Sequence, residues 1–395
     1  MSESSTKISA VQGLSSPKKD GHIRSHSLVP TILSSVLMAV GGMGDALLYV
    51  YLPVQGQALG MSLVTIGILL SINKFSRIFT NRWVAWFSRE WGVRKILMAG
   101  TVLSGLTTLM YAFNPDIWLW ILSRMIWGFS YSSFRFCTIQ YAGTSGKTGS
   151  ALGIGRSIQE MGPILAYWIG PVLINEVGAT PVFVLWSVAI TILLPLFIWL
   201  PDVKSPEQKI KALAFKKPGY IDYWIFVTSF AVEGLLVVGV SKLIDIKINS
   251  AGDLMVIAAL LISSRRFMNV LISPLSGWMS DSFSFKKTFR ISCFMIIAGV
   301  ALIAAGFSIT GVLIAYAGSA INMTLIPAIA IDYSPDDQNF EILTRMSTAR
   351  DIGSATGALL ALNIFALLNT TLPFVVVSVA LVFIWHKMPT LNYDQ

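Results

Sequence analysis

Long apolar segments recur along the whole chain and alternate with short polar gaps. The first runs from about Leu28 to Leu52, and eleven similar segments follow it. A helix of about 20 apolar residues crosses a bilayer. We expect membrane-spanning helices near residues 28–52, 62–87, 94–113, 117–141, 150–174, 180–200, 222–247, 254–279, 288–308, 311–332, 342–368 and 371–387. The pattern therefore predicts an all-α membrane protein with twelve transmembrane helices.

The composition supports a membrane protein. Hydrophobic residues make up 54% of the 395 residues and charged residues only 12%, whereas a soluble domain carries about 25% charged residues. The net charge of +9 would suggest a nucleic-acid partner in a soluble protein. Here the basic residues lie mostly in the gaps between apolar segments, so we expect a lipid bilayer as the partner and no nucleic acid.

The distribution of lysine and arginine predicts the orientation. Basic residues gather in the gaps after the second and eighth segments and in the central loop, whereas the alternate gaps contain almost none apart from Lys247. Loops rich in Lys and Arg stay on the cytoplasmic side. Both termini and the central loop are therefore expected in the cytoplasm.

The polar stretches divide the chain into two halves. We expect a disordered cytoplasmic tail over 1–27, a six-helix bundle over 28–200, a cytoplasmic linker over 201–221, a second six-helix bundle over 222–387 and a short tail over 388–395. The chain length and the compact loops favour the inner membrane of a bacterium, and we expect a monomer.

The two halves share an internal repeat. At an offset of 192 residues, Lys74 in the second segment matches Arg266 in the eighth. At an offset of 191, Glu160 in the fifth matches Asp351 in the eleventh. The first and seventh segments align less well, with Asp45 against Glu233. Nearly equal offsets that also match charged positions indicate two pseudo-symmetric bundles.

Twelve segments in two similar halves, with basic loops after the second and eighth, resemble the major facilitator superfamily. Gly277 and Asp281, followed by Lys286 and Lys287, resemble the loop signature that gates this family. The first-half copy keeps Gly92, Arg94 and Lys95, but Ala85 and Arg89 stand where the family has Gly and Asp. The resemblance implies alternating access, and the departures put the gating ion pair of the first half in doubt.

Three further motifs resemble those of exporting members. Arg124 before Trp127-Gly128 is similar to a signature linked to proton coupling. The Gly-Pro pairs at 162–163 and 170–171 resemble a signature common in antiporters. Asn73-Lys74-Phe75, with Arg77 and Asn81, resembles a second-span pattern of exporters.

Ionisable residues inside the segments are functional candidates, because burying a charge in a membrane is costly. Asp45 and Arg124 lie at the same depth in the first and fourth segments. We expect Asp45, beside Arg124, to carry a proton, with Glu160 and Glu233 as further carriers. The alternative for Asp45 and Arg124 is a permanent structural ion pair.

Among the charged residues well inside the segments, cations outnumber acids, eight against four. Because guanidinium groups bind carboxylate and phosphate well, this surplus predicts an anionic or zwitterionic substrate. The residues expected to bind it are Lys74, Arg77, Tyr131, Arg135, Arg265, Arg266, Arg350 and Asp351. Alternatively, some cations lie at helix ends, as Arg135 does if it extends toward lipid phosphates. Arg156 and Glu160 are four residues apart and are expected to pair.

The leading functional prediction is a proton-coupled exporter of a small anionic or zwitterionic metabolite, with a carboxylate siderophore as one candidate. A proton symporter that imports an organic anion is the alternative. A membrane enzyme or a receptor that transports nothing is the remote alternative, because no nucleophile–base pair or metal-ligand spacing is recognisable. We therefore expect no catalytic residues, no metal and no cofactor.

Overall fold

The described part of the chain is built from helices joined by short turns. The computed structural model describes residues 27–113, 116–145, 148–203, 218–243, 251–283, 285–332, 339–368 and 370–388, and these ranges contain no strand. Helices cover each apolar segment predicted from the sequence. Within the described residues, eight helical segments are long and apolar enough to cross a membrane. The protein is therefore an integral membrane protein with several spans.

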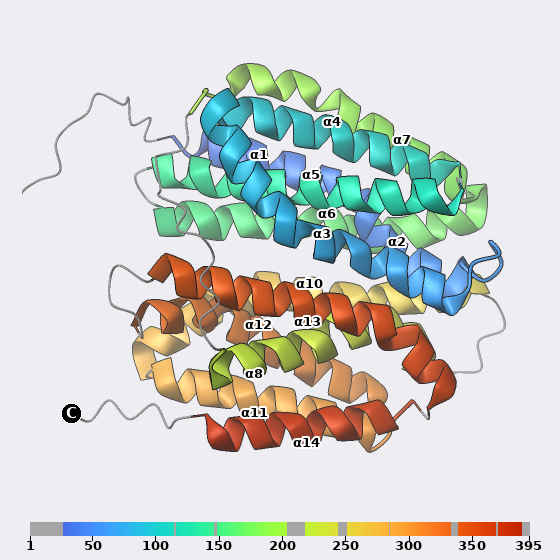
Figure 1. The fold of residues 1–395 in the computed structure, drawn as a ribbon, viewed down its shortest axis with the longest axis vertical. Helices are drawn as coiled ribbons and strands as arrows, with labels where there is room; N and C mark the ends of the chain where they lie inside the picture. Colours follow the sequence, from blue (N-terminus) through green and yellow to red (C-terminus); the bar gives the residue numbers. More distant parts are fainter. Residues whose placement is uncertain are drawn as a thin grey trace, which may run out of the picture.

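The elements follow one another in two runs (Figure 1). The first run consists of α1 (Val29–Gly41), α2 (Met43–Gln55), α3 (Leu63–Trp91), α4 (Val93–Ala112), α5 (Ile117–Thr144), α6 (Thr148–Val177), α7 (Ala179–Ile192) and the 3₁₀ helix η1 (Leu194–Trp199). The second run consists of α8 (Tyr220–Thr228), the π-helix η2 (Ser229–Leu235), α9 (Leu236–Leu243), α10 (Ala251–Phe283), α11 (Phe285–Ala304), α12 (Ser308–Asp332), α13 (Asn339–Leu367) and α14 (Leu372–Lys387).

Three of the predicted segments are not uniform α-helices: the sixth ends in the 3₁₀ helix η1, and the first and seventh are irregular near an acidic residue. The first is interrupted at Gly42, so that α1 and α2 are separate helices and the second ends only at Gln55. Consecutive glycines weaken a helix at such a point. The seventh contains one π-helical stretch between two short α-helices. Asp45 and Glu233, the acids of these two segments, lie in or next to the irregular turns.

Local side-chain chemistry fixes several helix ends. The Ser62 hydroxyl accepts a hydrogen bond from the Thr65 backbone N–H at 3.1 Å, which caps α3. The Asp116 carboxylate caps α5 in the same way, through the Trp118 N–H. Gly92 connects α3 to α4 with a φ of 87°, a backbone conformation that suits glycine. The turn between these two helices therefore depends on a residue without a side chain.

The helices form two packed groups, which are the upper and lower parts of Figure 1. In the first group α5 packs against α3 and α4, while α1 packs against α6. In the second, α11 packs against α12 and α13 packs against η2 and α8. The main contacts between the groups are α3 with α13, α6 with α10, and α2 with α9 and α10.

The two ends of the molecule differ. We call the end where α1 begins and α14 ends the terminal end, on the left in Figure 1, and the opposite end the far end. At the far end α2 packs against α9, and Leu48, Leu52, Leu236 and Val240 are at most 1% exposed. All four side chains belong to one buried apolar cluster that spans both groups, and we call them the apolar seal. Toward the terminal end, α1 packs mainly against helices of its own group.

Candidate functional site

Asp45 lies in the first turn of α2 and faces α5. Its carboxylate accepts hydrogen bonds from Arg124 Nη1 and, at 3.3 Å, from Asn73 Nδ2. Arg124 is completely buried, and its Nε donates to the Leu69 carbonyl at 2.8 Å. The two residues predicted to share a depth are therefore in contact, and the Leu69 backbone carbonyl also holds the guanidinium.

Glu233 occupies the π-helical stretch of the seventh segment and collects two arginines. Arg350 on α13 donates from Nε and Nη2 at 2.8–3.1 Å, and Arg265 Nη1 on α10 lies 3.7 Å away. A π-turn widens the helix locally and changes where its side chains point. Here that widened turn carries the carboxylate that joins α8–α9 to α10 and α13.

The other two acids form ion pairs between the two groups of helices. Arg77 Nη2 on α3 lies 3.1 Å from Asp351 Oδ1 on α13. Arg266 Nη1 on α10 lies 2.7 Å from Glu160 Oε2 on α6, and Asn269 Nδ2 contacts the other Glu160 oxygen at 3.3 Å. The two helix pairs with the most extensive packing across the interface, α3 with α13 and α6 with α10, are thus each joined by a charged contact near the middle.

Lys74 is a buried cation whose hydrogen bonds go to backbone rather than to a carboxylate. Its Nζ donates to the Glu233 carbonyl at 3.3 Å and to the Ser354 carbonyl at 3.2 Å, and lies 5.3 Å from the centre of the Tyr49 ring. The side chain comes from the first group and both carbonyls belong to the second. Lys74 therefore also joins the two groups.

These contacts reproduce the internal repeat. With the offset of 192 residues, Asn73 corresponds to Arg265, Lys74 to Arg266 and Arg77 to Asn269. Asn73 contacts the acid of the first segment, and Arg265 contacts the acid of the seventh. Arg77 and Asn269 likewise contact the matched acids Asp351 and Glu160. The pattern in the sequence thus corresponds to equivalent contacts in space.

Two arginines on the terminal side of this network have no carboxylate partner. Among the described residues Arg135 on α5 and Arg156 on α6 form no ion pair; Arg135 is half-buried and Arg156 is exposed. Arg156 interacts electrostatically with Glu160 but forms no ion pair with it, and the Glu160 oxygens contact Arg266 and Asn269 from the opposite helix. One turn from Arg135, the Tyr131 ring lies 4.6 Å from the Arg77 guanidinium.

The predicted gating loops are only partly described. Gly92 is buried, Arg94 is half-buried and Lys95 is exposed, at the turn between α3 and α4. In the second half Lys287 is exposed, whereas Gly277, Asp281 and Lys286 lie outside the described side chains. A side chain at position 92 would meet the Asp202 carboxylate, which faces this turn. Asp202 was not among the predicted gate residues.

Several other contacts in the network were not predicted from the sequence. Asn73 and Tyr111 surround the Asp45–Arg124 pair, with Tyr111 Oη 3.4 Å from Arg124 Nη1. Tyr49 follows Asp45 by four residues and lies against Lys74. Helical spacing from Asp45 is a signal that could have identified Tyr49, whereas Tyr111 belongs to another helix.

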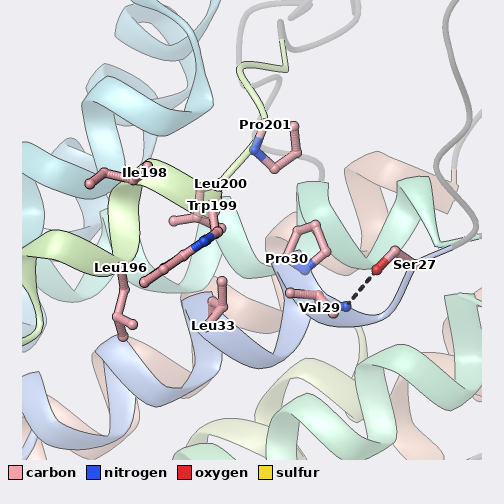
Figure 2. Close-up of a pocket in the computed structure, with 9 residues that line it drawn as sticks. All are labelled: Ser27, Val29, Pro30, Leu33, Leu196, Ile198, Trp199, Leu200 and Pro201. Atoms are coloured by element: carbon pink, nitrogen blue, oxygen red, sulfur yellow. Dashed lines mark hydrogen bonds between the residues drawn. The ribbon is translucent and has the colours of Figure 1, made fainter.

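The described residues contain no group of three or more metal-binding side chains. Cys137 and Cys293 are both buried and free. A pocket of about 720 Å³ lies between the start of α1 and η1 and is lined mainly by apolar side chains such as Leu33, Leu196 and Trp199, which Figure 2 labels. None of its nine lining residues is charged, so the pocket does not fit the ionic chemistry of the network.

Comparisons with known proteins agree with this architecture. The family model of the Major Facilitator Superfamily matches residues 34–261, which is more than half of the chain. A mutant form of the nucleoside transporter NupG superposes with a TM-score of 0.75 at 15% identity, covering 91% of this chain and 99% of that chain. A POT family transporter in complex with 5-aminolevulinic acid gives a TM-score of 0.73 at 12% identity, covering 95% and 98%. No curated protein sequence matches the chain.

The fold and the buried ionic network define a multi-pass helical membrane transporter rather than an enzyme. The chain belongs to the Major Facilitator Superfamily. Its function is therefore carried out in a lipid bilayer on a small-molecule substrate.

Proposed function

We propose that the chain spans the membrane twelve times, with both termini in the cytoplasm and with bundles over 28–200 and 222–387 joined by the linker 201–221. Basic loops on one side support this orientation, which places the terminal end in the cytoplasm. Outside the eight apolar segments, α5, α6 and α13 carry several charged residues, and α14 is apolar but only 16 residues long. The proposed location is a bacterial inner membrane, and the proposed active unit is the monomer.

We propose that the protein is a proton-coupled exporter of a small anionic or zwitterionic metabolite, working by alternating access. The observation that carries this proposal is the ionic network between the two groups of helices. All four of its acids are paired, and cationic side chains remain in excess. Buried charges of this kind mark substrate and proton paths in membrane proteins. A metabolite with a carboxylate, such as a siderophore, would neutralise part of the excess.

Asp45 and Arg124 are the proposed proton-coupling pair. Uptake of a proton by Asp45 would weaken its contact with Arg124 and leave the guanidinium held by the Leu69 carbonyl. Glu160 and Glu233 are the further candidates, since each also contacts two side chains from other parts of the chain. A change in one carboxylate would thus reach several helices at once.

Import of an organic anion by proton symport is the competing proposal. The same residues would serve it, because the driving ion gradient decides the direction. The Gly-Pro pairs of α6 favour export by resemblance. In the structure Gly162 lies directly against the backbone of Ala39, so close packing of α6 on α1 accounts for that glycine without any reference to direction.

Comparative metabolite profiling of a deletion strain and its parent tests the direction and identifies the substrate. Export predicts a compound that accumulates inside the deletion strain and disappears from its medium. A compound that stays unconsumed in the medium would instead establish import. Collapsing the proton gradient with an uncoupler should stop the flux in either case, and flux that survives would contradict proton coupling.

A further inference from the structure

Two faces of α3 pack against neighbouring helices. On one face the Thr80 hydroxyl lies 3.0 Å from the Ser132 hydroxyl of α5. On a second face Lys74 and Arg77 contact α13. Among the described residues α5 and α13 are the main helix partners of α3. In the half of α3 that leads to the terminal end, a third face therefore remains for the surroundings of the protein.

This third face is aromatic and carries one arginine. Its exposed side chains are Phe79, Arg82, Trp83 and Trp86. Spacings of three and four residues place them beside one another on one side of the helix, with about 5–6 Å between neighbouring Cβ atoms. The three aromatic side chains are 65%, 56% and 53% exposed. A face of this kind on a membrane protein contacts lipid, and tryptophans gather near the headgroups. We call it the lipid-facing stripe of α3.

Arg82 lies at a depth where a charge is costly. The 29 residues of α3 make a helix about 43 Å long, whereas the hydrocarbon core of a bilayer is about 30 Å thick. Arg77 is the middle residue of α3, and Arg82 follows it by five residues, which is about 7.5 Å toward the terminal end. With α3 centred in the bilayer, the backbone of Arg82 lies within the hydrocarbon core. Its side chain then extends toward the lipid phosphates.

The Arg82 guanidinium is not neutralised within the described part of the chain. No described residue forms a hydrogen bond or an ion pair with this side chain. Glu90, the only acid of α3, lies eight residues or about 12 Å further along the helix. An exposed arginine among aromatic rings therefore takes its partner from outside the protein, and the oxygens of a phosphate match the guanidinium group.

We propose that the lipid-facing stripe of α3 is a docking site for an anionic phospholipid. The lipid phosphate binds the Arg82 guanidinium, and the acyl chains lie along Phe79, Trp83 and Trp86. A zwitterionic lipid has a phosphate as well, but its own ammonium group compensates that charge. The site therefore prefers lipids with a net negative charge.

Binding of defined lipids to the purified full-length protein in a neutral detergent tests the site. The probes are phosphatidylglycerol and phosphatidylcholine with the same acyl chains, and bound lipid is measured by native mass spectrometry. One basic residue near a membrane surface is worth about fivefold in affinity for an anionic lipid. We expect phosphatidylglycerol to bind at least about fivefold more tightly than phosphatidylcholine. Equal affinities of the two lipids would overturn the proposal.

Substitutions of arginine locate the headgroup. R82Q should lower the preference for phosphatidylglycerol by about fivefold, and R82K, which keeps the charge, should retain more of it than R82Q. R290Q is the matched control, because Arg290 is an exposed arginine near the start of α11, a helix without tryptophan. Equal losses in R82Q and R290Q would indicate attraction to positive charge in general and would overturn a specific site.

The aromatic part of the site has its own tests. W83A/W86A should weaken the binding of both lipids, since the rings contact acyl chains that both lipids share, whereas R82Q should weaken only that of phosphatidylglycerol. Unchanged binding of both lipids to W83A/W86A would contradict the proposed position of the chains. Glycerol phosphate, which has a phosphate and no acyl chains, should not displace phosphatidylglycerol. Displacement at equal concentration would mean that the stripe binds a soluble phosphate instead of a lipid.

Discussion

Arg124 is held by more than its carboxylate partner. Its Nε donates to the Leu69 carbonyl, and Tyr49 and Tyr111 lie about 6 Å from the guanidinium. An arginine with so many fixed partners keeps its position when Asp45 changes charge. In the proposed proton coupling, Asp45 would therefore take up the proton, and Arg124 would be the fixed charge that Asp45 contacts or leaves.

Asp45→Asn should separate gradient-driven transport from exchange. The amide oxygen still accepts a hydrogen bond from Arg124, but asparagine cannot take up a proton. In proteoliposomes we expect proton-driven flux to fall by about tenfold or more, while exchange of substrate across the membrane without a gradient persists. Glu176→Gln, at an exposed carboxylate on α6, serves as the control. Unchanged gradient-driven flux in D45N would rule out Asp45 as the carrier.

Arg124→Ala should abolish transport and leave insertion into the membrane intact. Alanine leaves Asp45 without a cation and leaves the Leu69 carbonyl without its donor in a buried position. Flux measured against the amount of protein in the membrane checks this expectation. Full activity would mean that the pair has no part in transport.

At the scale of elements, two helix pairs connect the groups by the same device. The α3–α13 pair has Arg77 and Asp351, and the α6–α10 pair has Arg266 and Glu160. Removing one partner of a buried ion pair typically costs about 3–5 kcal/mol, because the other charge is left without compensation. Reversing both charges at once avoids that cost.

Charge reversal tests these contacts between the groups. R77D and D351R should each lower transport and thermal stability, and the R77D/D351R double variant should recover a large part of both. The same should hold for R266E with E160R. The mismatched combination of R77D with E160R serves as the control, since it breaks both pairs and restores neither. No recovery in either matched double variant would mean that these residues contact substrate instead of each other.

Gly67 sets the distance between α3 and α13 nearer the far end. A side chain there would collide with the Leu359 backbone carbonyl of the opposite group. Gly67→Val should therefore push the two helices apart and lower thermal stability and transport. Gly143→Ala on α5 is the control, because nothing lies within 4 Å of the added carbon. Wild-type activity in G67V would show that the interface does not need this close approach.

Several of these contacts could be anticipated from the sequence, and others could not. Counting residues from the span ends placed Asp45 and Arg124 at one depth, because the rise per residue in a helix is constant. The sequence of a single helix does not indicate which other helices it will contact across the interface. For that reason the sequence suggested Arg156 as the partner of Glu160, whereas Arg266 lies 106 residues away along the chain.

The π-helical stretch of the seventh segment could not be predicted from the sequence either. The apolar pattern around Glu233 fits an α-helix, and nothing in it predicts a π-helical stretch. In the structure this stretch packs closely against α13, a contact that the local sequence does not indicate. The repeat was the more informative signal. The match of Glu160 with Asp351 corresponds to two acids that each form an ion pair across the interface. The matched cations Lys74 and Arg266 both reach the opposite group, but Lys74 contacts backbone carbonyls and Arg266 contacts a carboxylate.

At the scale of the whole molecule, the far end is sealed by apolar side chains and the terminal side presents partly exposed arginines. With the termini in the cytoplasm, as proposed above, we expect the sealed far end to face the other side of the membrane. Both native cysteines are buried, so thiol reagents have little background in the unmodified protein. The access of such reagents can therefore report the state of each end.

An introduced cysteine at each end should react differently. We expect R156C to react with a membrane-impermeant thiol reagent in inverted vesicles, whose cytoplasmic face is outside. L52C, in the apolar seal, should be protected from both faces until the transporter changes state. Rapid labelling of L52C from the outer face of resting cells, with R156C protected, would mean that the dominant state opens the other way.

The two charged contacts between the groups lie near the middle of their helices and join two different helix pairs, α3 with α13 and α6 with α10. Two such points define a line through the molecule. If the groups rotate against each other about that line, residues close to it barely move, while those in the far-end seal travel furthest. The Arg77–Asp351 and Arg266–Glu160 pairs would then lie on the rotation axis. Their contacts would persist through the cycle. The main free-energy cost of switching states would then be the separation of Leu48 and Leu52 from Leu236 and Val240, and not the breaking of salt bridges.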